Sequence, residues 1–459
     1  MVKIAHSNFG SKDSQNPPIM IKNVIFSYSL APFLRTIPKT NMITSIYPRS
    51  GRCSTTQILA LTALVLVAFV TETALGNPPE EKASQYRAVG EANRILPESL
   101  ADGWISLFDG ESLLGWKIQT KTNWQVSEGT IKATEGKTGL LTTTSQFSDY
   151  ELRVEYKCDS QTNSGIFLRT NPKPKSAGKN CYEINIAPPE HPYPTGGVVD
   201  RQKIEPPAKP NEGWNELRMI VDGDDGQVYL NGELVNEFSA DDLGLGYIGL
   251  QFRKTEIQFR NIFLKPLRLK PMLSGTNLDQ WKMDQSRDST FTVDDDQNLH
   301  MQSGPGQLES KQHFADFVLS ASIKTNADGL NSGIFFRCIP GEKINGYESQ
   351  IQNQMKDGDP TKPVDCGTGG IFRRSNARRI VAEDGKWFYK TIVAVGPHIS
   401  VWVNGYQVTD WADKRKPDAN PRKGLRLEAG SIMLQGHDPT TDILIREINA
   451  AELRPRRPK

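Results

Sequence analysis

The sequence has few cysteines, few histidines and almost no net charge. Its 459 residues include five cysteines and six histidines, and 55 Lys and Arg residues stand against 53 Asp and Glu residues. A charge balance of this kind leaves no electrostatic footprint for nucleic acid, so we exclude nucleic acid as a partner. The chain has no CxxC pair and no His-rich spacing of the kind that holds a structural zinc ion. A structural zinc site is therefore not expected.

Long apolar runs are also scarce. Residues 58–70 form one such run (ILALTALVLVAFV), with Arg49 and Arg52 before it and the small-x-small pattern of residues 74–76 after it. This arrangement is typical of an export signal, and the run is shorter than the ~20 residues of a spanning helix. We therefore predict a leader over residues 1–76, export to the periplasm or the extracellular space, and no membrane span after cleavage. An uncleaved anchor is the alternative.

The few cysteines leave the disulfide question open. Cys53 lies in the leader, and the other four fall in two pairs along the chain, Cys158 with Cys181 and Cys338 with Cys366. An exported protein keeps disulfides, so one bond in each half is allowed. Four cysteines permit three pairings, and unpaired thiols are the alternative.

A duplication dominates what the sequence does contain. Residues 163–169 read NSGIFLR and residues 331–337 read NSGIFFR. Further matches follow in the same order: YEINI at 182–186 with YESQI at 347–351, TGG at 195–197 with 368–370, Trp214 with Trp387, Asn-Gly at 231–232 with 404–405, and YIGLQ at 247–251 with SIMLQ at 431–435. The offset is 168 at the first match and 173 at the tryptophans. This is a duplicated domain and not a solenoid unit of ~20–50 residues. We place a linker at 77–99 and the domains at 100–268 and 271–454.

Within each copy, apolar and polar residues alternate with a period of two. In residues 150–156, Leu152 and Val154 alternate with charged side chains. The Asn-Gly pairs at 231–232 and 404–405 are typical of tight hairpins, and neither copy has a convincing long amphipathic helix. The patterns predict an all-β fold, an antiparallel sandwich or jelly roll in each copy.

The same alternation gathers polar side chains on one face of a strand. In the first copy, Glu183 and Asn185 face away from the apolar residues of their strand. Glu348, Gln350 and Gln352 do so in the second copy. Each domain is therefore expected to present a carboxylate beside an amide.

The NSGIF strand is expected to add an arginine to this face. Alternation places a glycine, a phenylalanine and an arginine together in each copy: Gly165, Phe167 and Arg169, then Gly333, Phe335 and Arg337. An arginine and a glutamate from separate strands, near glycines that let a ligand approach the backbone, predict a polar binding site. An ordinary Arg–Glu pair on a sheet face is the structural alternative.

The closing strand distinguishes the two copies. Gln251 and Gln435 occupy the same place in the repeat, but His437 follows Gln435 by two residues, whereas Phe252 and Arg253 follow Gln251. If the strand continues, Gln435 and His437 point to the same surface. A lone histidine is more often structural, but its place beside a repeated glutamine favours a functional role.

Together the repeated NSGIF[LF]R, YE-x-[NQ]-I, TGG, tryptophan, Asn-Gly and GxIxLQ segments resemble the 3-keto-disaccharide hydrolase family. The resemblance covers residues 102–267 and 272–453. It implies two tandem concanavalin A-like jelly-roll sandwiches, each with carbohydrate on its concave sheet. This agrees with the all-β fold predicted from alternation.

The resemblance also implies an unusual way of breaking a glycosidic bond. A ketone at C3 of the sugar acidifies the C2 proton, a base removes it, the aglycone leaves C1 by elimination, and water adds to give net hydrolysis. The reaction needs a base and an electrophilic group near the C3 oxygen: an arginine, a histidine or a divalent metal ion. Carried onto this sequence, Glu348 is the base or a metal ligand, Arg337 and His437 face the enolate, and Gln350 and Gln435 orient the sugar.

The first copy matches this set in part. Arg169, Glu183, Asn185 and Gln251 occupy the equivalent positions, but the histidine is missing. His191, in the loop APPEHPYPTGG, is a candidate substitute. The second domain therefore fits the family better, and the first is a variant site or a binding domain.

Other functions remain open at this point. A conventional glycosidase needs two carboxylates about 5–10 Å apart across the scissile bond. The strands EINIA and ESQIQ each supply only one, which makes conventional hydrolysis the poorer enzyme hypothesis. A non-catalytic pair of carbohydrate-binding domains is the alternative from another class, with Trp116, Trp281 and Trp402 as sugar platforms, although a place in the core explains any single tryptophan more simply. A scaffold role at the cell surface is a third possibility.

Overall fold

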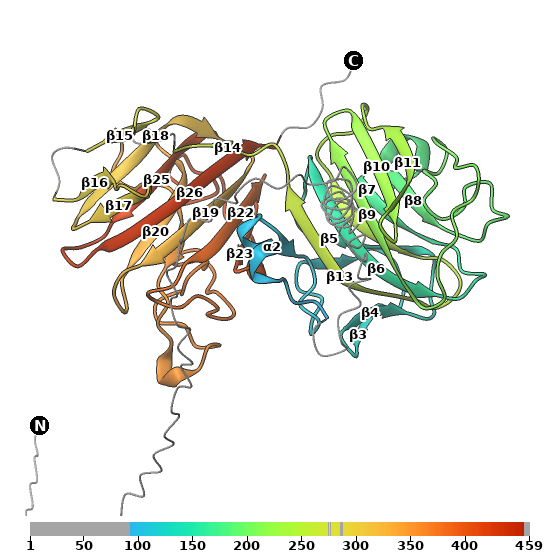
Figure 1. The fold of residues 1–459 in the computed structure, drawn as a ribbon. Coiled ribbons are helices and arrows are strands. Elements are labelled where there is room, and N and C mark those ends of the chain that lie inside the picture. The colour runs from blue at the N-terminus through green and yellow to red at the C-terminus, as the bar shows by residue number, and fades with distance from the viewer. Residues whose placement is uncertain (1–91, 274, 276, 285–287, 454–459) are drawn as a thin grey trace, which may run out of the picture. The chain divides into compact units, whose positions relative to one another are not determined.

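The computed structural model describes residues 92–273, 275, 277–284 and 288–453. The predicted leader with its apolar run, Cys53 and most of the predicted linker lie outside these residues. Within the described ranges the chain is built almost wholly from antiparallel strands, and no helix there is long and apolar enough to cross a membrane. Figure 1 shows the strands in two sandwiches that follow one another along the chain.

The first sandwich pairs a larger and a smaller sheet. The larger has the order β11-β10-β9-β6-β13-β4-β3, with β1 beside β13, and the smaller has the order β2-β5-β12-β7-β8. The larger sheet comprises β1 (Ile105–Ser106), β3 (Gln125–Ser127), β4 (Thr130–Ala133), β6 (Tyr150–Cys158), β9 (Trp214–Asp222), β10 (Asp225–Leu230), β11 (Glu233–Ser239) and β13 (Ile257–Pro266). The smaller comprises β2 (Trp116–Ile118), β5 (Gly139–Thr143), β7 (Ser164–Thr170), β8 (Tyr182–Ile186) and β12 (Tyr247–Phe252).

The second sandwich repeats this topology strand for strand. Its larger sheet has the order β24-β23-β22-β19-β26-β17-β16, with β14 beside β26, and its smaller sheet has the order β15-β18-β25-β20-β21. The larger comprises β14 (Lys270–Pro271), β16 (Thr290–Val293), β17 (Leu299–Gln302), β19 (Phe317–Thr325), β22 (Phe388–Val395), β23 (His398–Val403), β24 (Tyr406–Ala412) and β26 (Asp442–Glu452). The smaller comprises β15 (Trp281–Met283), β18 (Gly306–Phe314), β20 (Ser332–Cys338), β21 (Tyr347–Ile351) and β25 (Gly430–Gly436). The prediction of two tandem all-β jelly rolls is confirmed.

The helical segments among the described residues are short. They are α2 (Pro97–Ala101), which crosses the predicted boundary between linker and first domain, α3 (Ala177–Asn180) and the 3-10 turn η2 (Lys356–Gly358).

The cores form because alternate residues of each strand face the opposing sheet. Leu152 and Val154 of β6 are fully buried in the first core, as the period-two pattern predicts. The hairpins also form as predicted. Asn404 and Gly405, between β23 and β24, have φ of 48° and 73°, a conformation that Asn and Gly tolerate and that matches the twist of the two strands.

The tryptophans weighed as sugar platforms are buried in the structure. Trp116 donates its indole N–H to the Leu107 carbonyl at 2.6 Å, and Trp281 donates to Met272 at 2.7 Å. Trp402 is 1% exposed and donates to the carbonyl of Ser106 in the first sandwich at 2.9 Å. All three therefore serve the interior, and Trp402 joins the two sandwiches.

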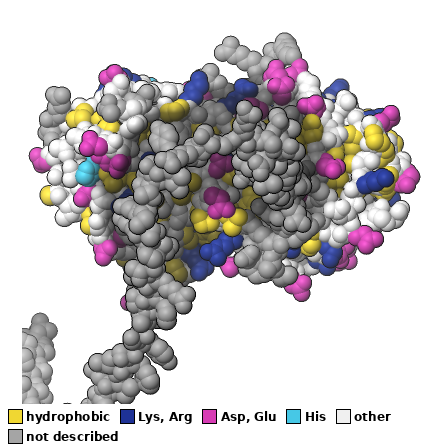
Figure 2. Space-filling model, in the orientation of Figure 1, with side chains coloured by type: hydrophobic (Ala, Val, Ile, Leu, Met, Phe, Trp, Pro, Cys, Tyr) yellow, Lys and Arg dark blue, Asp and Glu magenta, His cyan; other side chains and the backbone are white. Residues whose placement is uncertain are grey.

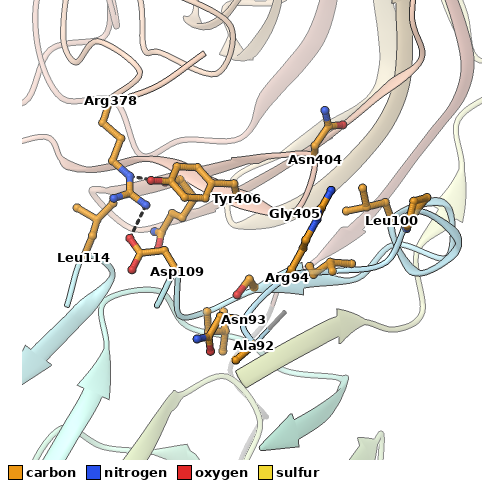
Figure 3. Close-up of a pocket in the computed structure, with 15 residues that line it drawn as sticks. Ala92, Asn93, Arg94, Leu100, Asp109, Leu114, Arg378, Asn404, Gly405 and Tyr406 are labelled. Carbon is orange, nitrogen blue, oxygen red and sulfur yellow. Dashed lines mark hydrogen bonds and ion pairs between the residues drawn. The ribbon is translucent and has the colours of Figure 1, made fainter. Parts of the chain in front are cut away.

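A second link between the sandwiches borders a cavity of about 370 Å³. Figure 3 shows Arg378 of the second sandwich reaching Asp109 of the first, and the two groups are 2.7 Å apart. Arg378 also donates to the Gln407 carbonyl at 2.8 Å. The described residues that line this cavity include none of the predicted site residues.

The four cysteines of the described domains are free thiols. Cys181, Cys338 and Cys366 are buried, and Cys158 is partly buried. The alternative of unpaired thiols therefore holds, and neither sandwich depends on a disulfide. On the face shown in Figure 2, acidic and basic side chains are interspersed, in keeping with the near-zero net charge.

Candidate functional site

The predicted acid and amide side chains lie on the face of each smaller sheet that points away from the core. In the first sandwich Tyr182 and Ile184 of β8 pack into the core, while Glu183 and Asn185 point the other way. The side chains of Glu348 and Gln350 on β21 repeat this arrangement. All four are less than a tenth exposed, so the sites are recessed and not open surfaces.

Each glutamate lies over the glycine of the neighbouring NSGIF strand. A β-carbon placed on Gly333 would meet the Glu348 Cγ at 2.8 Å and its Oε1 at 2.9 Å. On Gly165 it would meet the Glu183 Cγ at 3.2 Å. The glycines were expected to admit a ligand, but the structure gives their space to the carboxylate.

Burial changes the acidity of both glutamates in the same direction. Loss of solvent raises the pKa of Glu348 to about 7, against the opposing charges of Arg422, Lys390 and Arg373. It raises the pKa of Glu183 to about 7 as well, although the Gln251 side chain donates a hydrogen bond to it. A carboxylate with this pKa can take up a proton and release it near neutral pH.

The repeated glutamine of the closing strand has an unsatisfied side-chain oxygen in both copies. Gln251 donates its Nε2–H to Glu183 Oε1 at 3.1 Å, but its own Oε1 has no hydrogen-bond partner among the described residues. The Oε1 atom of Gln435 is buried and equally without a partner there. Because an unpaired buried acceptor costs about 1–3 kcal/mol, two such atoms at equivalent places indicate acceptors that await a ligand donor.

The other two predicted amides are already engaged. Gln350 Nε2 donates to Asn331 Oδ1 at 2.7 Å. Asn185 Nδ2 donates to the Tyr193 carbonyl and lies 3.3 Å from His191 Nδ1. The histidine proposed as a substitute in the first copy is thus next to Asn185.

The predicted placement of the two arginines is wrong. Arg337 has φ of 49° at a break in the pairing of β20 with β25, so the residue leaves the alternation that would turn it toward Glu348. Its guanidinium is fully buried and donates to main-chain carbonyls, of which Ala315 and Gly396 are each 2.7 Å away, and it pairs with Asp316 at 3.1 Å.

Arg169 repeats this arrangement in the first sandwich. It has φ of 45°, donates to the carbonyls of Ser148 at 2.6 Å and Leu243 at 2.8 Å, and pairs with Asp149 at 3.2 Å. The repeated arginine therefore ties loops together and does not face a sugar, so we assign neither copy a role in binding or chemistry.

His437 lies beyond the end of its strand. His437 was expected to point to the same surface as Gln435 if the strand continued, but β25 ends at Gly436. The imidazole is 39% exposed and its Nδ1 is 2.7 Å from Asp438 Oδ2. Its predicted role beside the enolate stays untested, and its structural partner is Asp438.

Sequence reasoning missed the cation that lies nearest Glu348. Arg422 Nη2 is 3.7 Å from Glu348 Oε2, and its guanidinium lies over the Phe335 ring at 5.4 Å. Its Nη2 also donates to the Ile344 carbonyl at 3.1 Å, which helps to fix its position.

A signal for Arg422 was present in the repeat. The offset between the copies is 173 at Asn231 and Asn404 but 184 at Tyr247 and Ser431, so the second copy carries 11 extra residues between these points. Arg422 lies in this longer stretch, residues 412–430, whose counterpart in the first copy is residues 239–246.

A second missed cation lies beneath β21. Lys390 is fully buried and donates from Nζ to the Gln350 carbonyl at 2.7 Å and to the Ser349 carbonyl at 3.3 Å. Burial lowers its pKa to about 7. The matched position of the first copy, three residues after the repeated tryptophan, is Leu217. The charge below the strand is thus particular to the second sandwich.

The metal ion that the family resemblance allowed finds no fitting set of ligands around Glu348. The charges that act on Glu348 are mainly those of the cations Arg422, Lys390 and Arg373, with Asp365 as the one acid among them, and this positive surrounding disfavours a divalent cation. In the described ranges, no three His, Cys, Asp or Glu side chains converge on a common point. We derive no step through a metal.

Comparison with known proteins gives a family match over both sandwiches. The family described as the 3-keto-alpha-glucoside-1,2-lyase-like domain matches residues 103–265 and again residues 268–450. The chain is 25% identical over 278 residues to a 3-keto-disaccharide hydrolase of Bacteroides thetaiotaomicron, an alignment that covers 45% of this chain and 96% of that protein.

Two solved structures are among those that match this chain in part. A candidate glycosyl hydrolase of Parabacteroides distasonis is 21% identical, with a TM-score of 0.35, 38% of this chain covered and 99% of that one. The carbohydrate-binding module CBM66 of Bacillus subtilis is 17% identical, with a TM-score of 0.27, 33% of this chain covered and 95% of that one.

Proposed function

Because the chain belongs to the family of 3-keto-alpha-glucoside-1,2-lyase-like domains, we propose that it cleaves 3-keto-glycosides by elimination and hydration, with the second sandwich as its catalytic half. The observation that carries the proposal is the buried Glu348, whose pKa is raised to about 7, with the Arg422 guanidinium 3.7 Å away. A base poised near neutral pH and a fixed cation are the two groups that this chemistry requires.

In the proposed reaction Glu348 removes the C2 proton, and the electron pair moves toward the C3 oxygen, where Arg422 stabilises the negative charge. The enolate then expels the aglycone from C1, and the departing oxygen takes the proton that Glu348 acquired. Water adds to C1 of the resulting enone, giving its proton to Glu348, which returns it to C2. The C1–O bond to the aglycone is broken, one water is consumed, and the carboxylate is regenerated.

The unpaired oxygen of Gln435 completes the proposed site. A sugar hydroxyl donating to this Oε1 would satisfy a buried acceptor that the described protein residues leave free, so binding would remove a cost already present in the fold. Such a contact would orient the ring over Glu348. Gln350, held by Asn331, would act through the shape of the site rather than as a free amide.

For the first sandwich we propose carbohydrate binding without turnover. Its Glu183 is engaged by Gln251, and the nearby Arg253 donates to Asn163 at 3.0 Å. No ion pair with Glu183 is present among the described residues, so the cation of the second site has no equivalent contact here. The orphaned Gln251 oxygen still offers a sugar hydroxyl an acceptor. A non-catalytic role for both sandwiches is the alternative function, and the acid–amide pairs support it equally.

We also propose that the protein is exported to the periplasm or outside the cell. The apolar run of residues 58–70, flanked by arginines and a small-x-small site, supports this. N-terminal sequencing of the mature protein from the exported fraction tests the cleavage. Retention of residues 58–70 in a membrane fraction would contradict it.

The function is tested by incubating the mature protein with a 3-keto-glucoside and with its unoxidised parent, with and without a chelator. We expect aglycone release from the keto sugar only. Release from the parent at a similar rate would point to conventional hydrolysis instead. No release from either, combined with binding of both, would favour the carbohydrate-binding alternative. Loss of activity on chelation would show that a metal takes part.

A further inference from the structure

A second cavity lies beside the Glu348 site and is rich in positive charge. Its volume is about 910 Å³, and it lies between strands β2 and β5 of the first sandwich and the end of β24 in the second. Five cations line it: Lys117, Arg373, Arg374, Lys414 and Arg415. Only two carboxylates, Asp410 and Asp413, accompany them.

Both carboxylates are already taken. Asp413 Oδ2 is 2.7 Å from Arg415 Nη2 and accepts a hydrogen bond from the Tyr347 hydroxyl at 2.7 Å. Asp410 is 2.9 Å from His398 Nε2 and accepts from Thr144 at 2.8 Å. The remaining positive charge of the cavity is therefore not neutralised by its own acids.

Four cations are left over. Among the described residues, no carboxylate lies within ion-pair distance of Lys117, Arg373, Arg374 or Lys414. The simplest explanation of these four unpaired cations would be an ordinary basic surface in contact with solvent. Arg374 argues against it, because this side chain is only partly exposed and lies among other arginines.

Arg374 is held in place by the backbone. It donates to the carbonyls of Arg422 at 2.7 Å and Arg373 at 3.1 Å. Its pKa is lowered by burial and then by the like charges of Arg415 and Arg422. Like charges gathered in a partly desolvated place are costly, and a bound anion would relieve that cost.

The cavity is joined to the proposed catalytic site through Arg422. The guanidinium of Arg422 approaches Glu348, while its main-chain oxygen accepts the hydrogen bond from Arg374. Arg373 also contributes to both places, since it lines the cavity and its charge acts on Glu348. One bound molecule could therefore occupy both.

Two of the five cations of the cavity, Lys414 and Arg415, come from a stretch that is longer in the second copy than in the first. Residues 412–430 include Lys414, Arg415 and Arg422, whereas the matching stretch of the first copy, residues 239–246, reads SADDLGLG and has no basic residue. The longer stretch thus brings basic side chains to a place where the first copy has only acidic and uncharged residues.

From these contacts we propose that the cavity binds an anionic group, a carboxylate or a phosphate, on the aglycone of the substrate. The inference rests on the proposed function and narrows it: the preferred substrate is an acidic 3-keto-glycoside. Arginines suit both anions, since their guanidinium groups can donate two parallel hydrogen bonds to either.

The test compares two aryl 3-keto-glucosides that differ only in charge, with 4-carboxyphenyl and 4-carbamoylphenyl aglycones. We expect the full mature chain to favour the carboxylate roughly tenfold in kcat/KM at low ionic strength, and to lose the preference in high salt. A 4-phosphonophenyl substrate distinguishes phosphate from carboxylate as the better anion. Equal kcat/KM for the charged and neutral substrates would overturn the proposal while leaving the proposed function intact.

Charge reversal locates the effect. Lys414→Glu should reduce the preference for the carboxylate roughly five- to tenfold without changing turnover of the carbamoyl substrate. Lys423→Glu, in the same stretch but outside the cavity lining, is the matched control and should keep the preference. Equal effects of the two variants would also overturn the proposal.

A separate outcome concerns the proposed function itself. If neither substrate is cleaved, that function fails, and calorimetric titration with inorganic phosphate then tests the cavity alone. Phosphate binding that Lys414→Glu abolishes and Lys423→Glu retains would support an anion site, and absence of binding to the unaltered protein would exclude one.

Discussion

The carboxylate of Glu348 occupies the space above Gly333 that any other residue would fill with its side chain. The neighbouring strand thus has no side chain at this one position, which leaves room for the carboxylate of Glu348. Gly333→Ala should push the carboxylate aside and lower kcat/KM at least roughly tenfold, or about 1.4 kcal/mol in the barrier, because a Cβ would come within 2.9 Å of its Oε1. Gly165→Ala, which meets Glu183 less closely, is the matched control. Steady-state kinetics that show equal, small effects would contradict the assignment.

Replacing the acid itself separates catalysis from binding. Glu348→Gln keeps the shape of the side chain but removes the base, so we expect turnover to fall by roughly 10²–10⁴-fold while the 3-keto sugar still binds. Glu183→Gln should leave turnover nearly unchanged. Calorimetry and product release measured on both variants make the comparison. If Glu183→Gln is the inactive variant, the two sandwiches have been assigned the wrong way round.

The raised pKa of Glu348 predicts the pH dependence of activity. The base must be ionised, so kcat/KM should rise about tenfold per pH unit below a pKa of about 7 and level off above it. A plateau that continues down to pH 5 would show that the acting group has an ordinary carboxyl pKa. The profile of Glu183→Gln should match that of the unaltered chain.

The same raised pKa predicts that the stability of the fold falls as the pH rises, whereas activity increases. A carboxyl whose pKa is higher in the folded than in the unfolded chain binds more protons when folded, so its contribution favours folding at low pH and is lost as the pH rises toward 7. Glu348→Gln should therefore be more stable than the unaltered chain at pH 8 and gain little at pH 4. Denaturant unfolding at the two pH values measures this, and an equal gain at both would contradict it.

Arg422 is predicted to act on charge that develops in the reaction. Arg422→Gln should lower kcat more than it raises KM, and it should raise the pKa of Glu348 further, because a cation 3.7 Å away is removed. The pH–rate profile should therefore shift to higher pH. Arg426→Gln, in the same stretch, contacts Ala419 and Glu428 instead and is the control. A profile that does not move would mean that Arg422 only shapes the loop.

Arg337 is predicted to matter for folding rather than for chemistry. Arg337→Ala should lower the free energy of unfolding by about 3 kcal/mol, since it leaves buried carbonyls without their donor and Asp316 without its cation. Arg379→Ala, an exposed arginine, should change it by less than about 0.5 kcal/mol. A variant of Arg337 that is stable but inactive would restore the role first expected from its place in the repeat.

The sequence was sufficient for the fold and for half of the site. Period-two alternation and the Asn-Gly pairs predict the strands and hairpins because these signals are local. Alternation likewise places Glu183 and Glu348 correctly. It fails at Arg169 and Arg337, since one residue with positive φ interrupts the alternation inside each strand, and no feature of NSGIFFR indicates that interruption.

The contacts of Arg422 and Lys390 could not be predicted by the same reasoning. Arg422 reaches Glu348 from an irregular stretch, and its direction depends on contacts with Phe335 and Ile344, which only the tertiary fold brings together. Lys390 has the parity of the core residues Phe388 and Ile392, so alternation turns it inward, but nothing in the sequence indicates the carbonyls under β21 to which it donates. The partners of a buried charge depend on the tertiary fold.

The unpaired thiols give each sandwich its own reporter of opening. Cys181 is buried in one, and Cys338 with Cys366 in the other, and reagents in solution can modify such sulfurs only while the residues that cover them have moved aside. The rate of thiol modification, measured for each cysteine-containing peptide by mass spectrometry, would therefore show which sandwich opens locally more often. It would do so in the intact chain, without adding any label.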